Sequence, residues 1–144
     1  MEENILVPYD GSAAAREALM YAVDRFEAAE FTILYVMDPM VDYGRQRAFP
    51  GYTDADEFTT EREKAEHLLE EALADLPAEL DVESSLAVGN PARAIIKHAD
   101  EREIDHIVIG SHGRSGIARF LLGSTAETVL RRSAVPVTVI RPSE

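Results

Sequence analysis

The sequence predicts an α/β protein in which one domain contains an open parallel five-stranded sheet with helices on both faces. Apolar runs alternate with segments of helical periodicity, in the order β-α-β-α-β-α-β-α-β. Runs such as HIVIG (106–110) are apolar without alternation, as expected for strands buried on both faces. No linker rich in Gly, Ser or Pro interrupts the 144 residues, so we expect residues 1–144 to form a single domain.

The first half of the chain contains four predicted elements. Residues 4–10 (NILVPYD) form a short β-rich run, and residues 11–28 carry apolar side chains at helical spacing. Residues 30–38 (EFTILYVMD) predict the second strand. Residues 54–76 predict a long amphipathic helix with acids in its first turn, where the helix dipole favours negative charge.

The second half contains five elements, of which the helix at 90–103 has the clearest start. Asn90 is suited to cap the free amides, and Pro91 loses nothing by lacking an N–H at the first helical position. The others are strands at 80–89, 104–110 and 135–142 and a helix at 124–133.

Two connections are unusually long. Residues 39–56 mix Pro, Gly, Tyr and Arg, and a mobile lid and a surface excursion without function are equally compatible with them. Residues 110–125 (GSHGRSGIARFLLGST) far exceed the usual strand-to-helix connection of about 2–6 residues. Their apolar members predict a short turn packed against the sheet: Ile117, Phe120, Leu121 and Leu122.

The charge balance restricts the class of partner. A net charge of −13 argues against nucleic acid and anionic membranes, which are polyanions. Lysine occurs only at Lys64 and Lys97, and an acidic, lysine-poor composition favours a halophilic protein, adapted to high intracellular salt. The alternative is an acidic protein from an ordinary cytoplasm. Salt adaptation predicts stability that rises from dilute to molar KCl.

The sequence predicts a cytoplasmic protein. Cysteine is absent, which excludes disulfides, thiolate metal sites and thiol nucleophiles. The start MEENILVPYD lacks the basic residues and long apolar run of a signal peptide. No segment approaches the roughly 18 consecutive apolar residues of a membrane span.

The glycines of the second long connection predict an anion site. Gly110, Gly113 and Gly123 follow the pattern G-x2-G-x9-G-S, and such glycines let backbone amides line a concavity. The stretch runs into a helix N-terminus, which also favours anions. Alternatively, Ser124 and Glu127 form an S-x-x-E capping box. Neither a P-loop motif nor a G-x-G-x-x-G after the first strand is present.

These residues resemble the universal stress protein family. The similarity lies in GSHGRSGIARFLLGSTAETVLRRSAVPVTVIRP, ILVPYDGSAAAREAL, LYVMD and VGNPARAIIKHA, in the family's order, and covers nearly the whole chain. The resemblance implies a Rossmann-like sheet with strand order 3-2-1-4-5. It also implies a homodimer through the last strand, Val135 to Ile140, which agrees with the tendency of an apolar edge strand to pair.

Family members with the intact glycine motif bind ATP, so the resemblance implies an adenine-nucleotide site for ATP, ADP or AMP. Asp10 would lie near the ribose and a phosphate-bound Mg2+, although its type and place also fit a turn or helix cap. Arg114 is a natural phosphate partner that could equally pair with surface acids. The implied binding residues are Pro8, Tyr9, Asp10, Val36, Val88, Gly89, Gly110, Ser111, His112, Gly113, Arg114, Gly123, Ser124 and Thr125.

No residue is assigned a catalytic role. His112 is interpreted as a donor in the loop because no nucleophile signature accompanies it. His67, His98 and His106 lack metal-ligand spacing and are expected at the surface or in packing.

The resemblance favours a dimeric ATP-binding stress-response protein with at most slow hydrolysis or autophosphorylation; its downstream partner is not specified. One alternative is an interaction module that binds no nucleotide. Another is an adenylating enzyme of the nucleotide-α-hydrolase-like group. Those enzymes carry a loop like S-G-G-x-D-S after the first strand, where this chain has PYDGSAAA.

Overall fold

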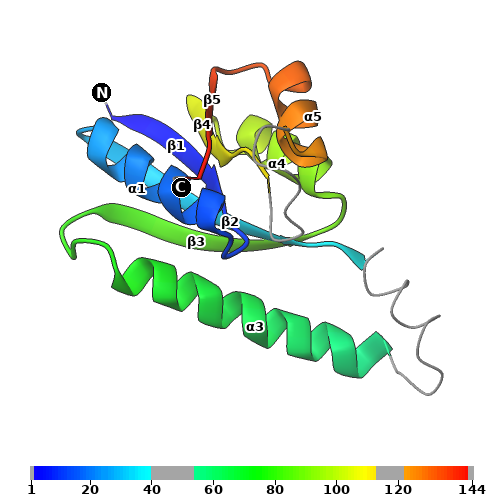
Figure 1. Cartoon of the computed structure of the whole chain (residues 1–144). Helices are drawn as coiled ribbons and strands as arrows, with labels where there is room; N and C mark the ends of the chain where they lie inside the picture. Colours follow the sequence, from blue (N-terminus) through cyan, green and yellow to red (C-terminus); the bar gives the residue numbers. More distant parts are fainter. Residues whose placement is uncertain (1, 40–53, 113–121, 143–144) are drawn as a thin grey trace.

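The computed structural model describes residues 2–39, 54–112 and 122–142 (Figure 1). Its elements lie within a few residues of the predicted ones and follow the predicted order. The strands are β1 (Glu3–Pro8), β2 (Ala29–Met37), β3 (Asp81–Val88), β4 (His106–Gly110) and β5 (Val137–Ile140). The helices are α1 (Ala13–Arg25), α3 (Asp54–Ala74), α4 (Pro91–Glu101) and α5 (Ser124–Arg132).

The five strands form one sheet in the order β3-β2-β1-β4-β5, and every neighbouring pair is parallel. Both the predicted fold class and the strand order are therefore confirmed. β1 lies at the centre, where Ile5 is in register with Phe31 of β2 and with His106 of β4. β3 and β5 are the two edges.

Helices cover both faces of the sheet (Figure 1). Alternate residues of β1 point to opposite faces, so Ile5 and Val7 join a core cluster with α1 and α3, whereas Leu6 joins a second cluster with α4 and α5. The central strand is buried against both helical layers, which explains its continuous apolar sequence.

The predicted start of α4 is confirmed. Asn90 is the N-cap residue, and its side-chain oxygen accepts a hydrogen bond from the backbone N–H of Arg93 at 3.1 Å. Pro91 follows at the first helical position, where no amide is needed. The sequence therefore predicts both the N-cap residue and the first residue of α4 correctly.

The capping-box interpretation of α5 is wrong. The N-cap residue is Gly123, which has no side chain to cap the helix, and Ser124 is already helical. Glu127 instead pairs with Arg131 one turn later at 2.8 Å. The S-x-x-E pattern lies one residue too late because Gly123 takes the cap position.

The other long connection, residues 39–56, lies almost entirely outside the described residues, and positions 54–56 are already part of α3. The lid hypothesis therefore stays a prediction. Among the described residues, no helix combines the length and apolar character needed to cross a membrane.

Candidate functional site

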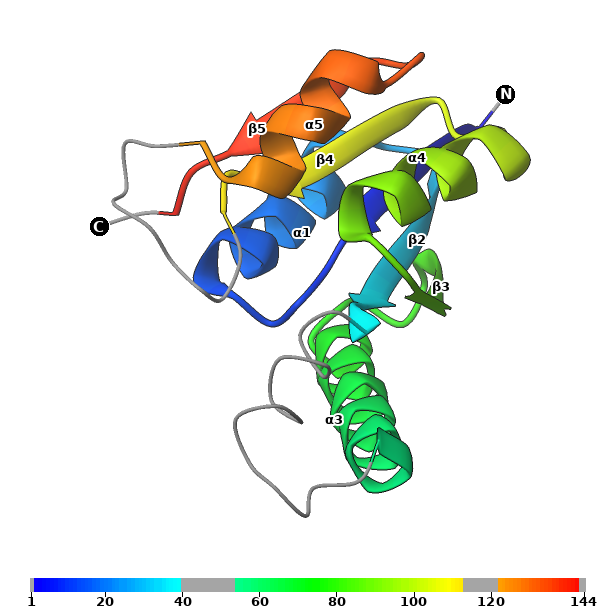
Figure 2. The same cartoon turned by 90° about the vertical axis from the view of Figure 1, so that its right-hand side faces the viewer.

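The candidate site lies where the connections from two adjacent strands diverge. β1 and β4 are neighbours, but the chain leaves β1 toward β2 and leaves β4 toward β5, on opposite sides. The carboxyl ends of both strands and the amino ends of α1 and α5 gather at this point (Figure 2). Ligands of open parallel sheets bind at such switch points.

The turn after β1 is held by two hydrogen bonds from backbone N–H groups to side chains. The backbone N–H of Ser12 donates to Oδ1 of Asp10 at 2.9 Å, and Oγ of Ser12 accepts from the N–H of Ala15 at 3.1 Å. Gly11 between them adopts φ +82°, which glycine tolerates best. Asp10 thus has the turn role that the sequence left open, and its metal role stays a prediction.

Tyr9 continues the pairing with β2 just after the end of β1. Its N–H donates to the carbonyl of Leu34 at 2.8 Å, and its side chain is buried in the core cluster of α1 and α3. This burial raises the pKa of the Tyr9 hydroxyl. Pro8, directly before it, is buried at the end of β1.

Gly110 at the end of β4 is required for packing. A Cβ at this position would lie 2.8 Å from both the carbonyl carbon and the Cβ of Ala14 and 2.9 Å from the backbone nitrogen of Ala15. The absence of a side chain lets the first turn of α1 approach β4. The sequence interpretation gave Gly110 a phosphate-binding role and missed this packing role.

Gly123 and Ser111 hold the two ends of the long connection together. The N–H of Gly123 donates to the carbonyl of Ser111 at 2.7 Å, and a Cβ on Gly123 would lie 3.0 Å from that oxygen. We call the bonded pair Ser111 and Gly123 the neck of the connection. The N–H of Ser111 donates to the carbonyl of Ile140 at 2.8 Å, which fixes the neck to β5. His112 lies beside the neck, with its Nδ1 3.1 Å from Oγ of the buried Ser111.

Residues 113–121 lie outside the described residues, so Gly113 and Arg114 keep their predicted roles without a structural test. The predicted apolar turn falls in the same segment except for Leu122, which is 38% exposed and does not pack as predicted. The described residues therefore define the neck of the loop rather than its tip.

The first turn of α5 follows the neck. Gly123 provides no side chain to cap the first amides of α5, and within the described residues the N-cap makes no side-chain hydrogen bond. Ser124 is exposed and Thr125 is half-buried in this turn. Exposed helical amides with adjacent hydroxyls favour an anion.

A second group of predicted residues lies at the ends of β2 and β3. Met37 is in register with Val88, and the N–H of Gly89 donates to the carbonyl of Met37 at 2.8 Å. Val88 is 53% exposed, and Val36 is half-buried on the side of the sheet covered by α4 and α5. An exposed apolar side chain beside a fixed backbone is suited to a flat apolar group.

Two residues of this region were missed by the sequence interpretation. Ser12 caps α1, and the hydroxyl directly before a helical pattern was its signal. Ile140 holds the neck through its carbonyl, which no sequence pattern indicates because the contact depends on the sheet.

The histidines outside the site have the expected packing and surface roles. His67 is exposed and pairs with Glu71 at 2.9 Å. Nε2 of His106 lies 2.7 Å from Oγ1 of Thr138 on the neighbouring strand. His98 is half-buried, and its Nε2 has no hydrogen-bond partner among the described residues. Burial lowers the pKa of His98, so the neutral form is favoured.

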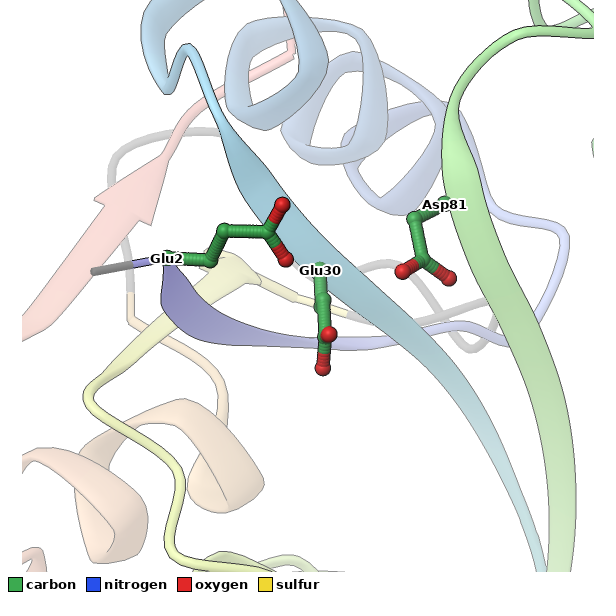
Figure 3. Close-up of side chains that lie close together, drawn as sticks. All are labelled: Glu2, Glu30 and Asp81. Atoms are coloured by element: carbon green, nitrogen blue, oxygen red, sulfur yellow. The ribbon is translucent and has the colours of Figure 1, made fainter.

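Three exposed carboxylates gather at the opposite end of the sheet. Glu2, Glu30 and Asp81 lie at the amino ends of β1, β2 and β3, with oxygens within 4.8 Å of one another (Figure 3). A hydrogen bond with Glu2 and the charge of Asp81 raise the pKa of Glu30. Asp10, the predicted metal residue, follows the carboxyl end of β1 and does not belong to this cluster.

Replacement of Glu30 by Gln is expected to raise the melting temperature slightly at pH 7, because it removes one of the crowded charges. A carboxyl whose folded pKa is raised contributes less stability as pH rises through that pKa, so the gain should shrink at acidic pH. It should also shrink in molar KCl, which screens the repulsion.

Thermal unfolding across pH and KCl tests this expectation. Glu79→Gln, an exposed change of equal charge outside the cluster, is the control. Equal effects of the two substitutions would show that local repulsion is not the cause.

The fold defines the class of the protein: a parallel α/β protein whose sheet has a switch point between β1 and β4. The sequence model of the universal stress protein family matches residues 1–141. The chain belongs to the universal stress protein family.

Similar proteins cover the same span. Universal stress protein MJ0577 of Methanocaldococcus jannaschii is 32% identical over 98% of this chain and 96% of its own length. The solved structure of the universal stress protein UspA from Lactobacillus plantarum has a TM-score of 0.71 and 30% identity, covering 96% of this chain and 97% of that chain. A universal stress protein solved in complex with cAMP has a TM-score of 0.61 and 27% identity, covering 99% and 98%.

Proposed function

We propose that this protein binds an adenine nucleotide, with ATP as the ligand and Mg2+ as the accompanying ion, and acts as a dimeric regulatory protein with slow turnover at most. The observation that carries the proposal is the neck formed by Ser111 and Gly123, which leads directly to the uncapped amino end of α5. The family relative solved with cAMP supports the choice of an adenine nucleotide.

The proposed site divides into a base end and a phosphate end. Val36, Val88 and Gly89, at the ends of β2 and β3, receive the adenine. Asp10 lies at the ribose and the metal-bound phosphates, beside the wall made by Pro8 and Tyr9. The residues proposed to surround the phosphates are Gly110, Ser111, His112, Gly113, Arg114, Gly123, Ser124 and Thr125.

Calorimetric titration with ATP tests the proposal. Because the chain carries a net charge of −13, long-range attraction cannot help an anionic ligand to bind. We therefore expect affinity to fall at least about tenfold when Mg2+ is replaced by EDTA, a loss of about 1.4 kcal/mol. Equal affinity in the two buffers would contradict the metal role.

The supernatant of denatured purified protein provides a second test. Adenine nucleotide released from the folded protein would support the proposal. No nucleotide there, together with no thermal shift on adding Mg-ATP, would favour an interaction module that binds no nucleotide.

The proposed dimer uses the free edge of β5. All four of its residues are half-exposed. The carbonyl of Pro136 accepts a hydrogen bond from the N–H of Ile107 in β4, and that of Ile140 accepts one from the N–H of Ser111 directly after β4. Because backbone groups alternate in direction along a strand, the N–H of Val139 points to the free edge. A second copy paired there would cover an exposed strand template.

Val139→Pro is therefore expected to give a monomer, since it removes an edge N–H while sparing the hydrogen bonds to β4. Sedimentation velocity measures the oligomeric state. Thr138→Pro is the matched control, because its backbone faces β4 and the change should lower the melting temperature more. A dimer that survives Val139→Pro would place the interface elsewhere.

A further inference from the structure

A groove lies on the surface between α4 and α5. Its volume is about 440 Å3. The two helices bury Ile95 and Val129 against the sheet and leave the groove on their outer side. The residues that line it, called the α4–α5 groove below, are Arg93, Ile96, Lys97, Asp100, Glu101 and Arg132.

The charge of this face differs from that of the rest of the molecule. α3 carries eight acidic and two basic residues, whereas α4 and α5 together carry three acidic and four basic residues. Lys97, one of the two lysines in the chain, lines the groove. The lining contains three cations and the carboxylates of Asp100 and Glu101, so it carries a net charge of +1 in a protein of net charge −13.

Two of the cations of the groove are available to an external partner. Within the part of the chain that the structure describes, Arg93 and Arg132 form no ion pair. Lys97 is only loosely paired with Glu101, at 3.9 Å between two exposed side chains. Exposed guanidinium groups bind carboxylates through two parallel hydrogen bonds.

The shape and lining favour a peptide rather than a small anion. The lining residues of α4 run from Arg93 to Glu101, a length of about 12 Å at 1.5 Å per residue. Ile96 is half-buried in the groove and gives it an apolar contact surface between the charges. A phosphate ion needs neither the length nor the apolar contact.

We propose that the α4–α5 groove docks an acidic segment of a partner protein, with carboxylates on Arg93 and Arg132 and an apolar side chain on Ile96. This partner site shares no residue with the proposed nucleotide site. Nucleic acid is a poor alternative, because its phosphates recur along the whole strand and would also face Asp100 and Glu101, whereas a peptide can place its carboxylates at the two arginines alone.

The proposal is tested by titrating the full chain with a short peptide of alternating glutamate and leucine while following the backbone amide signals by NMR. We expect saturable shifts at Ile96 and its neighbours on α4 and α5, which weaken as salt is added. A serine–leucine peptide, which keeps the apolar side chains but carries no carboxylates, should bind at least about tenfold more weakly. Absence of saturable shifts with the acidic peptide would overturn the proposal.

Charge reversal locates the site. The double substitution Arg93→Glu and Arg132→Glu should weaken peptide binding at least about tenfold. Arg131→Glu is the matched control, because Arg131 pairs with Glu127 and does not line the groove. Arg93→Gln with Arg132→Gln, a milder pair, should show an intermediate loss, and circular dichroism checks that each variant is folded.

Two outcomes would contradict the docking site. Equal peptide affinity in the double variant and the control would place the peptide elsewhere. Inorganic phosphate that shifts the same amides and displaces the peptide would identify a small-anion site instead. ATP affinity measured on the same variants should not change, so this test fails or succeeds separately from the proposed nucleotide function.

Discussion

Gly110→Ala is expected to destabilise the fold by about 2–3 kcal/mol, because the added methyl group would lie within 2.9 Å of three atoms of α1. Two of these atoms, the carbonyl carbon of Ala14 and the nitrogen of Ala15, belong to the backbone and cannot rotate away. Either α1 moves away from β4 or the strand shifts. Chemical denaturation of the wild-type protein and of Gly110→Ala measures the loss of unfolding free energy.

The double variant Gly110→Ala with Ala14→Gly separates the contacts. Removing the Cβ of Ala14 relieves one of the three close approaches and leaves both backbone contacts, so the rescue should be partial. Ala13→Ser, an exposed change in the same helical turn, controls for alteration of α1. Wild-type stability of Gly110→Ala would mean that β4 and α1 are not closely packed in solution.

The contact at Gly110 also explains where sequence reasoning is incomplete. The periodicity of apolar residues predicts each strand and helix, since local burial patterns are written in the local sequence. The distance between Gly110 and Ala14 depends on how two elements nearly a hundred residues apart pack. A glycine in a motif can therefore have a packing role that the motif does not reveal.

The start of α5 was mispredicted for the same reason, because it depends on a contact between segments that meet only in the folded protein. An S-x-x-E pattern predicts a cap at Ser124, but the hydrogen bond from Gly123 to Ser111 fixes the cap position one residue earlier. That bond closes a connection whose ends meet only in the folded protein. The start of α4, where Asn90 contacts its own helix, is local and was predicted correctly.

The acidic cluster shows that local sequence patterns are also insufficient to predict where charges gather in the fold. Glu2, Glu30 and Asp81 are distant in sequence and meet because three parallel strands begin at the same end of the sheet. Composition gives the net charge but not this concentration of charge. Strand order was available only from the family resemblance, and with it the cluster could have been foreseen.

Gly123→Val is expected to weaken ATP binding at least about tenfold, or 1.4 kcal/mol, because it forces apart the neck that leads to the proposed phosphate site. A Cβ at Gly123 would lie 3.0 Å from the carbonyl oxygen of Ser111 and 3.1 Å from Cα of His112. The backbone at Gly123 has φ −66°, which any residue adopts, so the effect is steric and not conformational.

Calorimetry with Mg-ATP on the folded variants measures the loss, and Gly123→Ala should give a smaller one. Ser124→Ala is the control, since it removes a hydroxyl but keeps the backbone and should cost less than Gly123→Val. Melting temperatures without nucleotide separate a loss of folding from a loss of binding. A folded Gly123→Val protein that binds ATP as the wild type does would show that the phosphates lie away from this neck.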